Sequence, residues 1–122
     1  MKLGKFLLPL FAFAVGLIVM LRLPNQLPPD YASYLSLATL AGMDSIFGGI
    51  RAGLDNKFKN DIFLSGFVVN MLLAVALAYL GDQIGVQDLY LAAVITLGGR
   101  IFLNLSVIRR QILERRLVRD QK

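Results

Sequence analysis

The stretch from Leu89 to Ile108 reads LYLAAVITLGGRIFLNLSVI, an apolar run with one charged residue, Arg100, in its interior. A second stretch, from Tyr31 to Arg51, reads YASYLSLATLAGMDSIFGGIR and carries Asp44. A charged side chain in a bilayer costs about 2.5–3.5 kcal/mol on insertion scales, and such charges usually have a partner or a function. These two opposite charges are therefore the most informative feature of the chain.

Two further apolar segments cover residues 6–23 and 62–80. A helix needs about 20 apolar residues to cross a hydrocarbon core, and the hydrophobic content of this chain, 57%, exceeds the ~45–50% of soluble domains. Since the first segment stays apolar through Leu21, we expect a retained anchor there, with a cleaved signal peptide as the alternative. Gly81 and Asp82 are expected to end the third segment with a turn. The sequence therefore predicts an all-α, polytopic membrane protein with four transmembrane helices.

The basic residues gather at alternate ends of these four segments. The connection of residues 81–88 has no lysine or arginine, and that of residues 22–30 has only Arg22. Lysine and arginine near the ends of spans favour the cytoplasmic side. We therefore expect an even number of spans, both termini in the cytoplasm and a multi-pass location in the cell (plasma) membrane. The basic ends contain Lys2, Lys5, Arg51, Lys57, Lys59, Arg109, Arg110, Arg115, Arg116, Arg119 and Lys122.

The two buried charges are expected at a similar depth. At a rise of 1.5 Å per residue, Asp44 lies about 10 Å and Arg100 about 13 Å from the cytoplasmic ends of their segments, which run in the same direction. An ion pair between them would offset the cost of burying each charge. Asn70 and Asn104 are expected at the same level, where their amides satisfy the remaining donors and acceptors. We therefore predict an intramembrane polar layer of Asp44, Asn70, Arg100 and Asn104.

Small residues are expected to mark the faces on which the helices pack, because they let helix backbones approach closely. The packing glycines predicted in this way are Gly48, Gly49, Gly66, Gly98 and Gly99. A kink or hinge at the two glycine pairs is the alternative. The faces predicted to turn inward are Leu37, Ala41, Asp44, Gly48 and Arg51 in the second segment, Gly66, Asn70, Ala74 and Ala78 in the third, and Ala92, Thr96, Arg100 and Asn104 in the fourth.

The chain contains no cysteine and no histidine. It therefore lacks the commonest general base, the commonest ligands of zinc and the residues of Ser–His or Cys–His catalysis. Gly48 and Gly49 lack the lysine that follows in a phosphate-binding loop, and Asp44 alone is a candidate acid or base. We expect no catalytic activity, no cofactor and no metal. The net charge of +5 collects at segment ends, so nucleic acid is not expected as a partner.

Residues 111–122 are expected to form a basic cytoplasmic tail after a transmembrane domain of residues 1–110. Glu114 follows Arg110 by four residues, a spacing that favours a helix continuing from the fourth segment. The tail is interpreted as a topology anchor attracted to anionic lipid. A helix that docks on a partner protein is the alternative.

Five short motifs occur along the chain: YLSL at 34–37, GGIRA at 48–52, SGF at 65–67, DLYLAAV at 88–94 and VIRR at 107–110. Together they resemble the small basic protein family, short bacterial membrane proteins of unknown function that are often encoded near cell-division genes in Gram-positive lineages. The resemblance covers about residues 6–110. It implies a polytopic helical membrane protein and transfers no activity or catalytic residue.

The sequence favours a scaffold or accessory subunit of a membrane complex associated with the cell envelope or cell division. The expected partners are the lipid bilayer and other membrane proteins, or further copies of the same chain. The alternative is a small oligomeric transporter or channel in which the polar layer lines a path. A closed layer with every polar group paired supports the scaffold, whereas a water-connected layer with an unpaired Asp44 supports transport.

Overall fold

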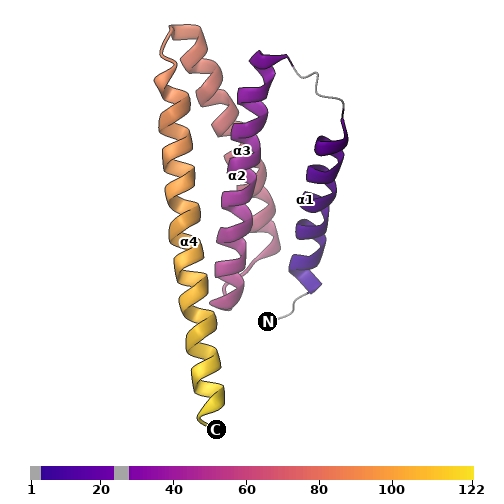
Figure 1. Cartoon of the computed structure of the whole chain (residues 1–122), viewed down its shortest axis with the longest axis vertical. Helices are drawn as coiled ribbons and strands as arrows, with labels where there is room; N and C mark the ends of the chain where they lie inside the picture. The colour runs from indigo at the N-terminus through magenta and orange to yellow at the C-terminus, as the bar shows by residue number, and fades with distance from the viewer. Residues whose placement is uncertain (1–3, 24–27) are drawn as a thin grey trace.

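The computed structural model describes residues 4–23 and 28–122, which form four helices and no strand. The helices run alternately up and down, so that α1 begins and α4 ends at the same end of the bundle (Figure 1). Their bounds are Gly4–Arg22 for α1, Pro29–Leu54 for α2, Asn60–Ile84 for α3 and Asp88–Asp120 for α4. The predicted all-α fold with four helices is confirmed. Lys2 and residues 24–27 of the first predicted loop lie outside the described residues.

The third helix does not end where the sequence predicted. It continues through Gly81 and Asp82 to Ile84, and Gly85 ends it with a left-handed backbone at φ 74°. Glycine adopts this conformation without the steric penalty of a Cβ atom. The Val86 N–H closes the turn by donating to the Gly81 carbonyl at 2.8 Å. The expected turn at Gly81 and Asp82 was therefore wrong, because a helix interior accepts glycine and only Gly85 has the left-handed conformation.

The second helix lies against both α3 and α4, and these three helices form the core. The hydrophobic core cluster consists of small or aliphatic residues: Leu37, Ala41, Ala74, Ala78, Ala93 and Leu97. Small side chains at these contacts let the helix backbones come close together. In contrast, α1 packs mainly against α2, and of its described side chains only Phe13 is even half-buried (Figure 1). The site described below is therefore built on α2, α3 and α4.

The inward face of α4 differs from the predicted one. Ala93, Leu97, Ile101 and Ile108 are buried, whereas Ala92, Thr96 and Arg100 are exposed and Asn104 is half-buried. Each residue turns a helix by about 100°, so the observed inward face of α4 is rotated by about 100° from the predicted one. The aliphatic face packs inward because it buries more apolar surface against α2. The predicted face of α2 is correct at Leu37, Ala41 and Asp44 but not at Arg51, which is exposed.

Only one of the five predicted packing glycines makes a tight contact. A Cβ atom at Gly49 would lie 2.8 Å from the Phe63 ring, and one at Gly48 would lie 3.8 Å from Asn104 Nδ2, an ordinary contact distance. A Cβ atom at Gly66, Gly98 or Gly99 would meet no atom within 4 Å, so these three predictions were wrong within this chain.

A contact that the sequence analysis missed lies at Gly42, where a Cβ atom would lie 3.4 Å from the Phe67 ring. Gly42 and Gly49 are two turns apart on α2, and Phe67 and Phe63 are one turn apart on the antiparallel α3. The projecting aromatic rings of α3 therefore decide which glycines of α2 are needed for packing.

Polar contacts tie the helices together at both ends of the bundle. At one end, the Tyr34 hydroxyl donates to the Asp82 carboxylate, and the Ser36 and Tyr90 hydroxyls lie 3.1 Å apart. At the other end, Arg115 donates to the Leu54 carbonyl, and Gln111 donates to the Asp55 carboxylate. These last two contacts satisfy acceptors at the carboxyl end of α2. The helix α4 is continuous across residue 110. Since Gln111 and Arg115 contact the end of α2, the first part of the expected tail packs against the bundle.

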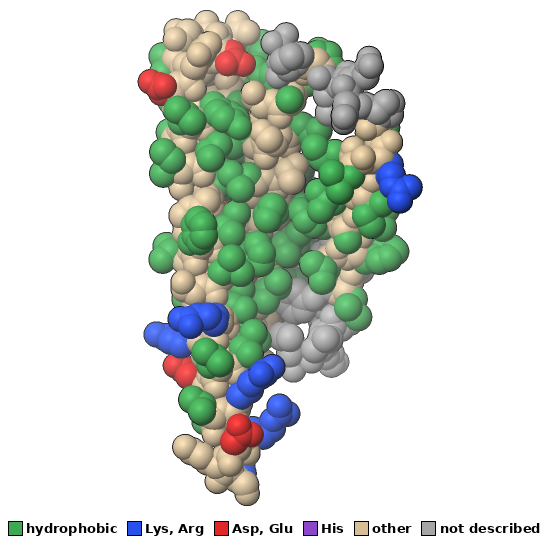
Figure 2. Space-filling view, viewed as in Figure 1, with side chains coloured by type: hydrophobic (Ala, Val, Ile, Leu, Met, Phe, Trp, Pro, Cys, Tyr) green, Lys and Arg blue, Asp and Glu red, His purple; other side chains and the backbone are tan. Residues whose placement is uncertain are grey.

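Two of the helices, α3 and α4, are long and apolar enough to cross a membrane by length and composition. Apolar side chains cover the middle of the bundle surface, and most of the visible lysines and arginines gather where α4 protrudes (Figure 2). Large apolar side chains such as Ile95, Phe102 and Leu103 are mostly exposed. Contiguous apolar surface of this kind marks contact with a membrane or another protein.

Alanine substitutions separate the tight glycine from the open ones. Gly49→Ala is expected to lower the melting temperature of the purified protein, because the new Cβ atom must displace a Phe63 ring that already packs between Phe58 and Phe67. Overpacking of this kind costs about 1–3 kcal/mol. Gly99→Ala, the matched control, is expected to leave the melting temperature unchanged or raise it, since alanine favours helix by about 1 kcal/mol. Equal melting temperatures for the two variants would contradict this packing.

Candidate functional site

Asp44 lies on the buried face of α2, one turn after Ala41. Its side chain is 0% exposed. Among the described residues, Asp44 is the one charged residue that is buried. A carboxylate without solvent or a partner is strongly disfavoured in an apolar interior. The position of Asp44 therefore demands a compensating group from a neighbouring helix.

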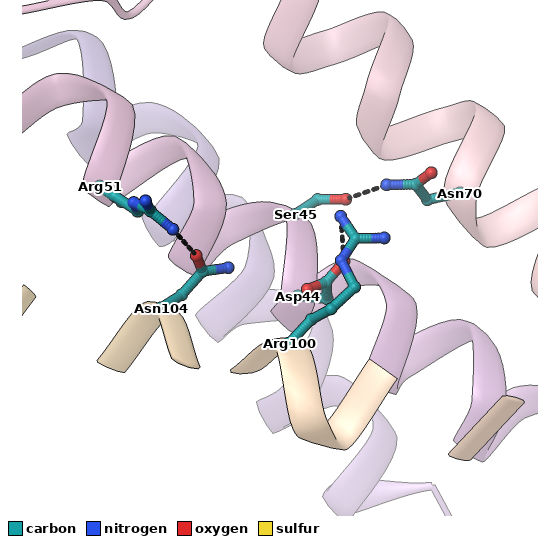
Figure 3. Close-up of polar contacts among 6 residues, drawn as sticks. All are labelled: Asp44, Ser45, Arg51, Asn70, Arg100 and Asn104. Atoms are coloured by element: carbon teal, nitrogen blue, oxygen red, sulfur yellow. Dashed lines mark hydrogen bonds and ion pairs between the residues drawn. The ribbon is translucent and has the colours of Figure 1, made fainter. Parts of the chain in front are cut away.

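Arg100 of α4 provides that group. Its Nη2 atom lies 3.1 Å from Asp44 Oδ2, so the ion pair predicted from the sequence is present (Figure 3). The two partners have different environments, because the Arg100 side chain is 55% exposed while that of Asp44 is fully buried. A long arginine can bury its stem along apolar surface and keep its charged group near the boundary. Arg100 thus reaches Asp44 from a position on the exposed side of α4.

The ion pair leaves the carboxylate incompletely satisfied. Neither Oδ1 nor Oδ2 of Asp44 accepts a hydrogen bond from the part of the chain that the structure describes. The contact is therefore a single ion pair and not the two parallel hydrogen bonds that arginine often makes with a carboxylate. Most of the stabilisation of the buried charge comes from the opposite charge alone.

The two asparagines do not join this pair. Asn70 Nδ2 donates to Ser45 Oγ at 3.2 Å, and Asn104 Oδ1 accepts from Arg51 Nη1 at 3.3 Å (Figure 3). The predicted layer, with the amides of Asn70 and Asn104 completing the Asp44–Arg100 pair, was therefore wrong in its connections. Asn70 faces the residue after Asp44, and Asn104 lies one turn beyond Arg100, where it meets Arg51.

The predicted polar layer omitted Ser45 and Arg51, although Arg51 was expected on the same face of the second segment as Asp44. Ser45 follows Asp44 directly, and Arg51 lies two turns further along α2. The position of Arg51, seven residues after Asp44, could have indicated its place in the layer, because residues seven apart lie on one side of a helix. For Ser45, the available indication was that it directly follows Asp44 in the sequence. The polar side chains therefore form three separate contacts along α2: Ser45–Asn70, Asp44–Arg100 and Arg51–Asn104.

Three hollows open beside these contacts. One, of about 200 Å³, lies between α2 and α3 and is lined in part by Asp44, Ser45, Asn70 and Arg100. A second, of about 260 Å³, lies between α3 and α4 and reaches Asn70 and Arg100. The third, of about 420 Å³, lies between α2 and α4. Within the described residues, no group of three or more acidic, histidine or cysteine side chains is placed to hold a metal ion. The polar side chains that border these hollows are charged or hydrogen-bonding groups.

The different environments of the paired charges predict unequal effects of neutralising each one. Arg100→Gln leaves the buried Asp44 without its partner, which typically costs about 3–5 kcal/mol. Asp44→Asn leaves a half-exposed arginine that can turn to the boundary, so we expect a smaller fall in melting temperature and in abundance. The double variant is expected to be more stable than Arg100→Gln alone. Equal losses for the two single variants, without recovery in the double variant, would rule out the pair as a stabilising contact.

Residues 27–113 match the family described as "Protein of unknown function (DUF1290)". The chain is similar to the small basic protein of Bacillus subtilis, with 44% identity over 106 residues that make up 87% of each chain. It is also similar to uncharacterised proteins of Mycobacterium tuberculosis and Mycobacterium bovis, each 39% identical over 102 residues, or 83% of this chain and 84% of the relative. No solved structure matches it. The resemblance inferred from the sequence motifs is thus confirmed, and the chain belongs to the small basic protein family, DUF1290, a family of unknown function.

Proposed function

We propose that this protein spans the membrane four times, with both termini in the cytoplasm, and serves as a non-catalytic scaffold or accessory subunit of a membrane complex. The observation that carries the scaffold proposal is the free end of α4. Beyond Arg115, which contacts α2, the helix runs on to Asp120 outside the bundle (Figure 1). The last part of α4, residues 111–120, is rich in arginine and carries exposed aliphatic side chains, namely Ile112, Leu113, Leu117 and Val118.

Exposed aliphatic side chains on a protruding helix favour contact with another protein. Leu113 is 48% and Leu117 is 62% exposed, and their spacing of four residues places them on one side of α4. Arginines on the same helix suit the polar rim of such an interface. The association with the cell envelope or cell division rests on the family resemblance and is part of the proposal.

Two features support the proposed membrane topology. The carboxyl-terminal parts of α2 and α4, with Arg51 and Arg109, and the connection from α2 to α3, with Lys57, lie toward the end where α1 begins (Figure 1). This fits a cytoplasmic side rich in basic residues. The tyrosines lie near the opposite ends of their helices, where aromatic rings suit a membrane interface: Tyr31, Tyr34, Tyr79 and Tyr90.

Because the chain has no native cysteine, single-cysteine variants can test the topology. Lys59→Cys and Val118→Cys are expected to resist a membrane-impermeant maleimide in intact cells and to react after permeabilisation. Gln87→Cys is expected to react in intact cells. Labelling of Val118→Cys from outside, with the protein still in the membrane, would reject cytoplasmic placement of the carboxyl end.

The scaffold proposal predicts that the free end of α4 is needed for a partner but not for folding. Leu113→Ser/Leu117→Ser is expected to abolish copurification of a membrane protein partner from native membranes. The abundance and the melting temperature of this variant are expected to equal those of the unmodified protein. A matched variant, Ile95→Ser/Phe102→Ser, changes exposed apolar residues on the part of α4 proposed to lie in lipid. Full recovery of the same partners with the Leu113/Leu117 variant would contradict docking at this end.

A second function, an oligomeric transporter or channel, is favoured by the hollow of about 200 Å³ that reaches Asp44 and Arg100 and has Lys57 at its edge. Asp44 accepts no hydrogen bond from the described residues, which suits a group that receives a passing ion or proton. Purification of the protein as a ring of its own copies, together with ion flux in proteoliposomes that Asp44→Asn abolishes, would replace the scaffold proposal with this one.

A further inference from the structure

The largest of these hollows, of about 420 Å³, lies between α2 and α4 near the end of α2. Its lining includes Arg51, Lys57 and Arg100, together with Asn104 and the acidic residue Asp55. Three cationic side chains and one carboxylate therefore border one open space. The proposed scaffold contact lies further along α4 and uses none of these residues.

The positive charges of this hollow are only partly compensated. Arg100 is paired with Asp44, but neither Arg51 nor Lys57 has a carboxylate within ion-pair distance among residues 4–23 and 28–122. The Asp55 carboxylate accepts a hydrogen bond from Gln111 of α4. An excess of positive charge thus faces the hollow, and it attracts an anion.

The hydrogen-bonding groups of the hollow are mostly donors. Arg51 uses one nitrogen to donate to Asn104 Oδ1, which leaves its remaining N–H groups available. Since Asn104 Oδ1 is engaged, its Nδ2 amide remains a donor, and it lies 3.8 Å from where a Gly48 Cβ atom would be. Lys57 adds an ammonium group. Guanidinium, amide and ammonium donors together match the oxygens of a phosphate.

We propose that this hollow binds the phosphate of an anionic lipid headgroup. Its wall contains Leu103, which is 65% exposed, and the next residue back along α4, Phe102, is 74% exposed. Apolar side chains beside a phosphate-binding group suit a lipid, whose acyl chains need such contact, better than a free anion. Basic pockets between membrane helices on the cytoplasmic side bind anionic headgroups in this way. The proposal rests on the membrane placement proposed above but not on the scaffold role.

The test measures retention of lipid by the purified full-length protein, so it needs no partner. Protein from nanodiscs containing equal phosphatidylglycerol and phosphatidylcholine is expected to retain phosphatidylglycerol preferentially, as measured by native mass spectrometry. Arg51→Gln/Lys57→Gln is expected to weaken that binding about 30-fold, because each charge near an anionic surface contributes about fivefold. The control, Arg116→Gln/Arg119→Gln, removes the same charge from the free end of α4 and is expected to retain the preference.

A second variant keeps the proposal testable if the charge variant fails to fold. Gly48→Leu places an apolar side chain at the wall of the hollow without changing any charge, and a Cβ atom there makes only an ordinary contact. It is expected to lose the preference for phosphatidylglycerol while remaining monodisperse. Equal retention of both lipids by the unmodified protein, or equal loss of the preference in the control, would overturn the proposal.

Competition with inorganic phosphate distinguishes the two ligands that could supply a phosphate to the hollow, a lipid headgroup and the free anion. We expect phosphate at millimolar concentration to displace phosphatidylglycerol only weakly, because it lacks the apolar contact. Saturable binding of inorganic phosphate that requires Arg51, without any preference for phosphatidylglycerol, would assign the hollow to the free anion and overturn the lipid assignment.

Discussion

The burial of Asp44 is the constraint on which the rest of the structure depends. A carboxylate with no exposed surface must be neutralised by a neighbouring helix. Arg100 is the described residue that does so, which fixes how α4 lies along α2. The end of α2 then lies beside α4, where Gln111 contacts the Asp55 carboxylate and Arg115 contacts the Leu54 carbonyl. One electrostatic requirement in the middle of the bundle therefore sets the register of α2 against α4.

The packing of α2 against α3 follows a different rule, because it depends on shape. Phe63 and Phe67 of α3 project toward α2, and glycines at positions 42 and 49 make room for their rings. Asn70 meets Ser45 on the α3 side of α2, while Asn104 meets Arg51 on the α4 side. The polar side chains thus form separate contacts on the two sides of α2.

This division has a consequence for function. Arg100 pairs with the Asp44 carboxylate and helps hold the bundle together. Within the described chain, neither Arg51 nor Lys57 forms an ion pair with a carboxylate. Two kinds of surface remain open to other molecules. One is the basic hollow between α2 and α4, and the other is the end of α4 that extends past the bundle in Figure 1. Both lie toward the end of the molecule where α1 begins and α4 ends. The proposed lipid and protein partners would therefore meet this chain at the same end of the bundle.

The amino-acid sequence by itself determined the all-α class, the four helices to within a few residues, the family and the Asp44–Arg100 pair. The helices follow from the lengths of the apolar runs, the family from short sequence motifs, and the pair from the cost of burying two opposite charges at a similar depth. The tertiary structure decided the rotation of α4, the glycines that matter and the partners of Asn70 and Asn104. A helix changes its inward face by about 100° when it turns by one residue. Which face wins depends on the side chains of the neighbouring helices, and no pattern within one helix contains that information.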